Sequence, residues 1–424
     1  MQTSLLGIAK KAQNNPKHRF GNLYGCLNEE YLLECWQYVK KNAASGVDKV
    51  SAREYEVNLQ ANIKSLVERL KSNTYRAKLI RRVYIPKESG KLRALGLPST
   101  EDKLLQCAVS RILNSIYEQD FLRCSYGYRP KIGVLDAVDK LTVKLQFGRY
   151  RYVVEADIRS YFDTIDHTWL IKMLEQRVAD KSFLRLIKKW LKAGVLETDG
   201  KVICPETGTP QGGVVSPVLS NVFLHYCLDL WFRKEVTKRC KGEAFIIRYA
   251  DDYVCGFEHK HEVEKFFRVM PKRLAKFGLE LSEEKTQIIE FDRNARGKTS
   301  FEFLGFEFRW GEDRKGKPHL KRTTSKKKFR SSIKRFAQWC RAARHLPITK
   351  LFDSLRRRLV GYYNHYAIMS NGRMMQLYFL EVQKILYKWL NRRSQRKSYT
   401  WQGFNDLMRH FSIPAPQTRV RPRR

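Results

Sequence analysis

The sequence predicts an α+β fold, and two kinds of apolar pattern support this prediction. Short β-prone runs, Phe245–Arg248 and Tyr253–Phe257, flank a turn, as in an antiparallel hairpin. Longer stretches, such as Leu59–Leu70 and Leu377–Leu390, carry apolar residues at helical spacing. At 424 residues and 43% hydrophobic content, the chain can bury a substantial core. Its length suggests roughly two to three domains.

The predicted elements cover most of the chain. In order they are helices in Tyr31–Val39 and Leu59–Leu70 separated by a break at Gly46, a strand in Ala77–Ile85 leading to a turn at Lys87–Lys91, a helix in Asp102–Tyr117, a strand in Arg151–Ile158, helical stretches in Leu170–Leu191 and Val214–Leu230, the hairpin, a basic helical pattern in Lys321–Arg358, and helices in Leu359–Tyr366 and Leu377–Leu390. Pro217 lies in the first turn of its helix, where a missing N–H costs no hydrogen bond.

The charge of the chain predicts a nucleic-acid partner. Lys and Arg number 82 against 43 Asp and Glu, a formal net charge of +39. Surface cations are often only solvated, but an excess this large repels itself unless a polyanion screens it. From Gly311 to Arg424 there are 29 basic and 5 acidic residues, so we expect most backbone binding in this last quarter.

The cysteines and apolar runs indicate a soluble, cytoplasmic protein with no membrane partner. The chain has nine cysteines, an odd number without a C-x-x-C pair, which is most simply explained by reduced packing residues. The apolar stretch near the N-terminus is too short for a signal peptide, and no run approaches transmembrane length.

The hairpin turn carries two adjacent acids, Asp251 and Asp252. Paired Asp residues in turns are commonly just solvated turn formers. A third carboxylate, Asp157, ends the strand-like run before Ile158. Because Mg²⁺ prefers a few carboxylates plus substrate phosphates, acids that converge from separate segments suit a two-metal phosphoryl-transfer site. In this interpretation Asp157 and Asp251 bridge two ions and Asp252 is an outer ligand.

With these residues the chain resembles a reverse transcriptase of the group II intron-like lineage, from about Tyr38 to about Phe411. The blocks that carry the resemblance occur in the family's order. They are Ser45–Asp48, Ile85–Lys87 with Leu95–Pro98, Ser125–Pro130, the strand ending at Asp157, Thr209–Gly213, Tyr249–Asp252, Leu279–Ser282 with Lys285–Thr286, and Phe303–Gly305.

The resemblance implies a right-hand polymerase with fingers, a palm built from an antiparallel sheet with helices, and an α-helical thumb. We expect an N-terminal helical extension over 1–75 and fingers and palm over 76–310. A helical thumb similar to the maturase X domain is expected over 311–395, and a basic C-terminal tail over 396–424. We expect no nuclease module rich in His and Cys after the predicted thumb.

The resemblance also implies nucleotide-binding residues. Gln211 precedes Gly212 and Gly213, whose missing side chains let backbone approach a ligand; an ordinary loop is the alternative. Phe162, five residues after Asp157, matches the steric gate that selects deoxynucleotides. A Phe near a strand end can equally be a core residue.

Three cations and one carbonyl complete the predicted site. Lys87 and Arg93, near a turn that also holds Lys91, match triphosphate contacts, with a solvated turn as the alternative. Lys285 resembles the lysine that protonates the leaving pyrophosphate, although a Lys before a strand is usually a surface residue. The backbone carbonyl of Ile158 is a further predicted metal ligand.

The predicted function is that of an RNA-directed DNA polymerase, a nucleotidyltransferase that uses two Mg²⁺ ions, with Mn²⁺ as the alternative metal. Expected partners are a structured RNA template, a DNA or RNA primer, dNTPs and the cDNA product. We favour a ribonucleoprotein in antiviral (antiphage) defence that copies a dedicated noncoding RNA. The alternative is a group II intron-encoded maturase for splicing and retromobility. A scaffold with a vestigial polymerase is disfavoured because the predicted site residues are intact.

Overall fold

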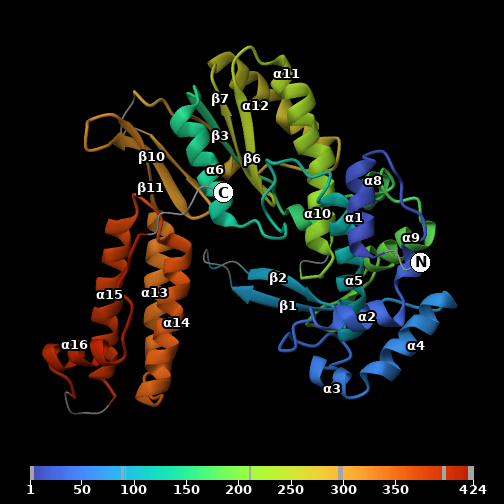
Figure 1. Ribbon diagram of the computed structural model, residues 1–424, viewed down its shortest axis with the longest axis horizontal. Coiled ribbons are helices and arrows are strands. Elements are labelled where there is room, and N and C mark those ends of the chain that lie inside the picture. Colours follow the sequence, from blue (N-terminus) through green and yellow to red (C-terminus); the bar gives the residue numbers. More distant parts are fainter. Residues whose placement is uncertain are drawn as a thin grey trace. The chain divides into compact units, whose positions relative to one another are not determined.

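The computed structural model describes residues 4–86, 90, 92–209, 212–294, 299–393 and 398–418. The chain divides into two compact units (Figure 1). The first comprises Met1–Ala137 and Ala156–Ile288, and the second comprises Val138–Glu155 and Ile289–Arg424. The predicted α+β fold is confirmed.

The first unit is built from helices, one small sheet and part of a second sheet, whose strands β3 and β8 cross the boundary between the units in sequence. Its helices are α1 (Leu5–Asn14), α2 (Glu29–Trp36), α3 (Ala52–Val57), α4 (Leu59–Lys71), α5 (Thr100–Tyr117), α7 (Tyr161–Thr164), α8 (His167–Leu174), α9 (Lys181–Leu191), α10 (Ser216–Leu224), α11 (Thr237–Arg239) and α12 (Lys260–Ala275). Helix α5 lies in the core, with Leu104, Leu105 and Ile112 fully buried. It begins at a cap in which the Ser99 hydroxyl accepts the Asp102 N–H at 3.1 Å.

One sheet of the first unit has the strand order β2-β1-β4-β5. Its strands are β1 (Ile80–Pro86), β2 (Leu92–Leu97), β4 (Val195–Leu196) and β5 (Val202–Ile203). Strands β1 and β2 are antiparallel, and Pro86 pairs with Leu92.

The second sheet has the order β6-β7-β3-β8 and carries the acidic turn. Its strands are β3 (Tyr152–Asp157), β6 (Ala244–Tyr249), β7 (Asp252–Phe257) and β8 (Gln287–Glu290). Strands β6 and β7 are antiparallel and pair from Ala244↔Phe257 to Tyr249↔Asp252. Consecutive residues of β6 and β7 are buried, so both faces of these strands are covered, which is why both predicted strand runs read as continuous hydrophobic stretches.

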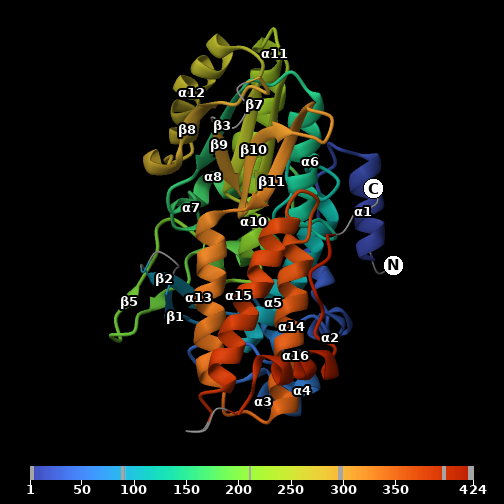
Figure 2. The same ribbon diagram turned by 90° about the vertical axis from the view of Figure 1, so that its left-hand side faces the viewer.

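The second unit combines a three-stranded antiparallel sheet with long helices that run alongside one another (Figure 2). The elements are β9 (Ser300–Phe303), β10 (Phe306–Glu312), β11 (Pro318–Thr324), α13 (Lys326–Ala343), α14 (Ile348–Tyr366), α15 (Gly372–Leu390) and α16 (Trp401–His410). Helix α6 (Val134–Phe147) spans the boundary between the units in sequence. Leu355, Leu359, Val382 and Leu386 are buried between the helices.

The basic helical pattern predicted over Lys321–Arg358 is helical for most of its length but is not one helix. Its first four residues finish β11, and the rest forms two helices, α13 and α14. Pro347 explains the break, because proline disfavours helical backbone in the residue before it and starts a new helix well.

Two other helical predictions needed division. Leu170–Leu191 is two helices, since Asp180 caps a new one by accepting the N–H groups of Ser182 and Phe183. Val214–Leu230 is α10 followed by a π-helix over His225–Asp229. Apolar periodicity does not distinguish these cases from one straight helix.

Candidate active site

Asp251 and Asp252 lie at the tip of the β6–β7 hairpin. Tyr249 pairs with Asp252, which leaves Ala250 and Asp251 as the two-residue loop. Ala250 has φ +58°, a conformation that non-glycine residues seldom adopt, so the surrounding structure must hold this turn. Burial raises the pKa of Asp251, and the charge of Asp157 raises it further. Such a carboxylate is stabilised by any cation placed beside it.

Arg248 supports the turn through buried hydrogen bonds. Its side chain is 0% exposed and makes a bidentate ion pair with Asp229, at 2.8 Å from Nε to Oδ1 and 2.6 Å from Nη2 to Oδ2. Nη1 donates to the Ala250 carbonyl at 3.0 Å and to Asn221 Oδ1 at 3.1 Å. Nη2 also donates to Ser125 Oγ at 2.7 Å. One fully paired guanidinium therefore ties the turn to two other segments.

A close backbone contact reinforces this support. A Cβ on Gly127 would lie 2.3 Å from the Ala250 nitrogen, so only glycine fits there. Asn221 Nδ2 donates to the Gly127 carbonyl at 2.7 Å while its Oδ1 accepts from Arg248. The Ser125–Pro130 block thus packs directly against the acidic turn.

Asp157 ends strand β3 and forms an ion pair with Lys285, with Nζ 2.6 Å from Oδ2. Lys285 lies in a short 3₁₀ turn, Glu283–Lys285. The hydrogen bond to Asp157 raises the pKa of Lys285, and the charges of Asp157, Asp252 and Asp251 add to this effect. All three predicted acids therefore act on one ammonium group.

The neighbouring residue Ile158 pairs with Leu281 in an isolated antiparallel bridge. The hydrogen bonds of this bridge come from flanking residues: Ser282 N donates to the Asp157 carbonyl at 2.8 Å, and Arg159 N to the Glu280 carbonyl at 2.9 Å. The Ile158 carbonyl consequently points away from Leu281.

An aromatic pair lies beside the acids. Phe162, in α7, is 9% exposed and contacts Tyr128 edge to face, with ring centroids 6.2 Å apart. Burial raises the pKa of Tyr128, and the charges that also act on it include those of Asp251 and Arg93. Arg93 is exposed on β2. Tyr128 belongs to the site although the sequence singled it out only as part of a block.

Lys87, Lys91 and Gln211 lie outside the described residues. Next to Gln211, Gly212 has φ +119°, and a Cβ there would be 2.5 Å from the Gly96 carbonyl oxygen. Gly212 therefore lies against β2, the strand that carries Arg93.

The acids suit a metal held jointly with substrate. Within the described ranges, no three His, Cys, Asp or Glu side chains close on a single ion. Mg²⁺ usually takes one or two carboxylates, several waters and substrate phosphates instead of an all-protein cage. The carboxylate oxygens of Asp157, Asp251 and Asp252 are donors of this kind.

In the described part of the chain, no helix is both long and apolar enough to cross a membrane.

Comparisons with known proteins identify the class. Residues 85–308 match the family described as reverse transcriptase (RNA-dependent DNA polymerase). The chain belongs to this family and is an RNA-directed DNA polymerase.

Its relatives narrow the class to group II intron-like reverse transcriptases, which confirms the resemblance seen in the sequence. Protein YkfC of Escherichia coli (strain K12) is 34% identical over 281 residues, or 58% of this chain and 73% of YkfC. The group II intron-encoded protein LtrA of Lactococcus lactis subsp. cremoris is 31% identical over 361 residues, or 71% of this chain and 59% of LtrA. A putative COX1/OXI3 intron 1 protein of Saccharomyces cerevisiae is 27% identical over 407 residues, or 85% of this chain and 47% of that protein.

Proposed function

We propose that Asp157, Asp251 and Asp252 hold two Mg²⁺ ions with which the enzyme extends a primer on an RNA template. The observations that support this are the ion pair of Asp157, at the end of β3, with Lys285 and the action of the Asp251 and Asp252 charges, from the β6–β7 turn, on the pKa of the same Lys285. When bound, the metal ions would lower the pKa of the primer 3′-hydroxyl and neutralise the negative charge of the triphosphate. The Ile158 carbonyl is a candidate additional ligand.

The remaining residues bind and select the nucleotide. Arg93 and, by the resemblance, Lys87 contact the triphosphate, while Gln211 contacts the incoming nucleotide. Phe162, braced by Tyr128, leaves no room for a 2′-hydroxyl and so favours dNTPs. Lys285, whose pKa is raised by its hydrogen bond to Asp157 and which is therefore protonated at neutral pH, is the proposed proton donor to the departing pyrophosphate.

The second unit is the proposed RNA-binding part. Helix α13 contains no acidic residue, and Lys327, Arg330, Lys334 and Arg341 are exposed at positions three to seven apart, along one helical face. None of these four forms an ion pair with a described residue. The stripe is about 21 Å long, which suits contact with successive phosphates of a nucleic acid backbone.

The biological role has two candidates. A dedicated noncoding RNA, copied by a ribonucleoprotein in antiphage defence, remains a hypothesis carried by the resemblance alone. Similarity to LtrA supports the alternative, an intron-encoded protein that acts in splicing and retromobility. Sequencing the DNA that flanks the gene distinguishes them: intron ribozyme domains support the second role, and a short structured RNA gene supports the first.

Replacing Asp251 and Asp252 together with Ala tests the catalytic assignment. We expect primer extension to fall below roughly one per cent of wild type, because the acids hold the metal. RNA binding in a filter assay should stay nearly unchanged, because cations outside the turn hold the RNA. Extension above a few per cent would reject the assignment. Loss of RNA binding in a folded variant would reject the proposed division of labour.

A further inference from the structure

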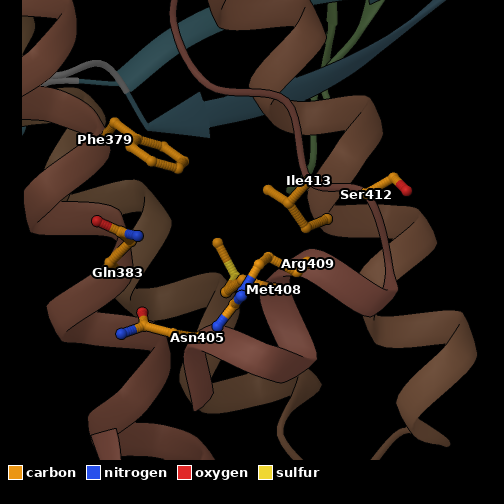
Figure 3. A pocket seen from close by; sticks show the side chains of 7 residues that line it. All are labelled: Phe379, Gln383, Asn405, Met408, Arg409, Ser412 and Ile413. Atoms are coloured by element: carbon orange, nitrogen blue, oxygen red, sulfur yellow. The ribbon is translucent and has the colours of Figure 1, made fainter. Parts of the chain in front are cut away.

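The second unit contains a hollow of about 420 Å³ between α15, α16 and the segment that follows α16 (Figure 3). Its apolar lining comes from Phe379, Met408 and Ile413, and its polar lining from Gln383, Asn405, Arg409 and Ser412. The volume lies within the range of small-ligand pockets, about 300–1,000 Å³.

The wall of the hollow is fixed by contacts behind it. Ile413 N donates to the Met408 carbonyl at 3.1 Å, and the Tyr363 hydroxyl donates to the Pro414 carbonyl at 3.2 Å. Phe411 stacks on Phe352, with ring centroids 4.4 Å apart. The segment after α16 is therefore held against the helices, and the hollow is largely preformed.

Two amides in the hollow have hydrogen-bonding capacity to spare. The side chains of Gln383 and Asn405 are half-buried and make no hydrogen bond with any described residue. Figure 3 shows both amides on one side of the hollow, with Phe379 above them and Ile413 across from them. Arg409 differs, because it already forms an ion pair with Asp406 at 2.6 Å.

We infer that this hollow binds one unstacked base of a single-stranded nucleic acid. The inference rests on the proposed RNA-binding role of the second unit. A base needs an apolar surface to stack on, which Phe379, Met408 and Ile413 supply, and polar groups for its edge. Gln383 and Asn405 each present a donor and an acceptor together, as base edges do.

The net charge of this part of the chain favours this occupant. From Gly311 to Arg424 the chain has 29 basic residues and 5 acidic ones, so a strand whose phosphates flank the inserted base meets an attractive field.

The test measures binding of fluorescein-labelled oligouridine and oligodeoxyuridine to the full chain by anisotropy across a salt series. The variant is Gln383→Met combined with Asn405→Leu, which keeps side-chain volume and removes the amides. Gln402→Met is the matched control, because Gln402 is an exposed amide of α16 that does not line the hollow. Lys334→Ala is the comparison for a phosphate contact.

We expect the double variant to weaken binding about tenfold without changing the salt slope, because it removes base contacts and no charge. Lys334→Ala should instead reduce the salt slope by about one. Weakening of both oligonucleotides assigns the site to a base of either strand, and weakening of oligouridine alone assigns it to RNA.

Photocrosslinking with thiouridine-containing RNA gives an independent readout. The wild type should yield crosslinks in the peptides that contain Phe379 or Met408, and the double variant should lose them. Unchanged affinity of the double variant, or crosslinks confined to other peptides, would overturn the base site while leaving RNA binding intact. Failure of the wild type to bind RNA at all would overturn the proposed function as well.

Discussion

At the scale of single residues, the site depends on side chains that other side chains hold in place. The ring of Phe162 contacts the ring of Tyr128, and the charges of both Asp251 and Arg93 act on the pKa of Tyr128. The acids were predictable from sequence because each lies at the end of a recognisable strand. Tyr128 was not, because its neighbours come from distant segments and its backbone has φ +58°, which no periodic pattern reveals.

Phe162→Val should admit ribonucleotides. Removing the ring opens space beside the sugar, so the preference for dNTP over rNTP should fall by about tenfold or more. Single-nucleotide incorporation measures this preference. Tyr128→Phe keeps the contacting ring and should leave the preference unchanged. Equal discrimination by Phe162→Val and wild type would show that another residue forms the gate.

At the scale of elements, the β6–β7 hairpin is held by a buried charge network. Arg248 and Asp229 are both fully buried, and Arg248 also bonds the carbonyl of Ala250. The hairpin itself was predicted from two short β-prone apolar runs that flank an acidic turn. The network was not, because its partners Asp229 and Ser125 are far away in sequence and Asp229 lies in a π-helix.

Replacing the pair by apolar residues separates stability from positioning. Arg248→Met alone leaves Asp229 buried without a partner and should cost about 3–5 kcal/mol in the free energy of unfolding. Adding Asp229→Leu should restore much of that stability. The rate of primer extension should nevertheless stay about a hundredfold low, because the turn has lost its hydrogen bond at Ala250.

A second ion pair, between the buried Arg177 and the half-buried Asp120 at 3.0 Å, supplies the control. It lies away from the acidic turn in the sequence and bonds the backbone of the N-terminal segment. Arg177→Met with Asp120→Leu should alter stability and leave kcat near wild type. Full activity in the Arg248 double variant would contradict a positioning role for Arg248.

Burial of His225, the first residue of the π-helix, makes the free energy of unfolding sensitive to acid. Burial lowers the pKa of His225 to about 4 in the folded state. In the unfolded state the same side chain binds a proton below about pH 6.5, so between these two pH values only the unfolded state is protonated. The free energy of unfolding should therefore fall by about 3 kcal/mol as the pH drops from about 6.5 to 4. His225→Phe should flatten this part of the pH profile in urea titrations. An unchanged slope would mean that other groups cause the acid loss.

At the scale of the whole molecule, the chain joins a small, specific catalytic site to a large, unspecific positive charge. The net charge of +39 follows from composition and was readable at once, as was the family from its blocks in order. The sequence analysis predicted neither the separation of α13 from α14 nor the helix α16. A basic stretch with apolar residues at helical spacing has the same pattern whether it forms one helix or two.

Counting metal ions tests the central claim most directly. A complex with template, chain-terminated primer and the next dNTP can be titrated with Mn²⁺ and followed by electron paramagnetic resonance. The proposed mechanism predicts two protein-dependent ions in the wild type, as a two-metal site requires. Asp251→Asn should lose this binding while the template stays bound. The same number of ions, with the same affinities, in wild type and Asp251→Asn would contradict the assignment of the metal site to this turn.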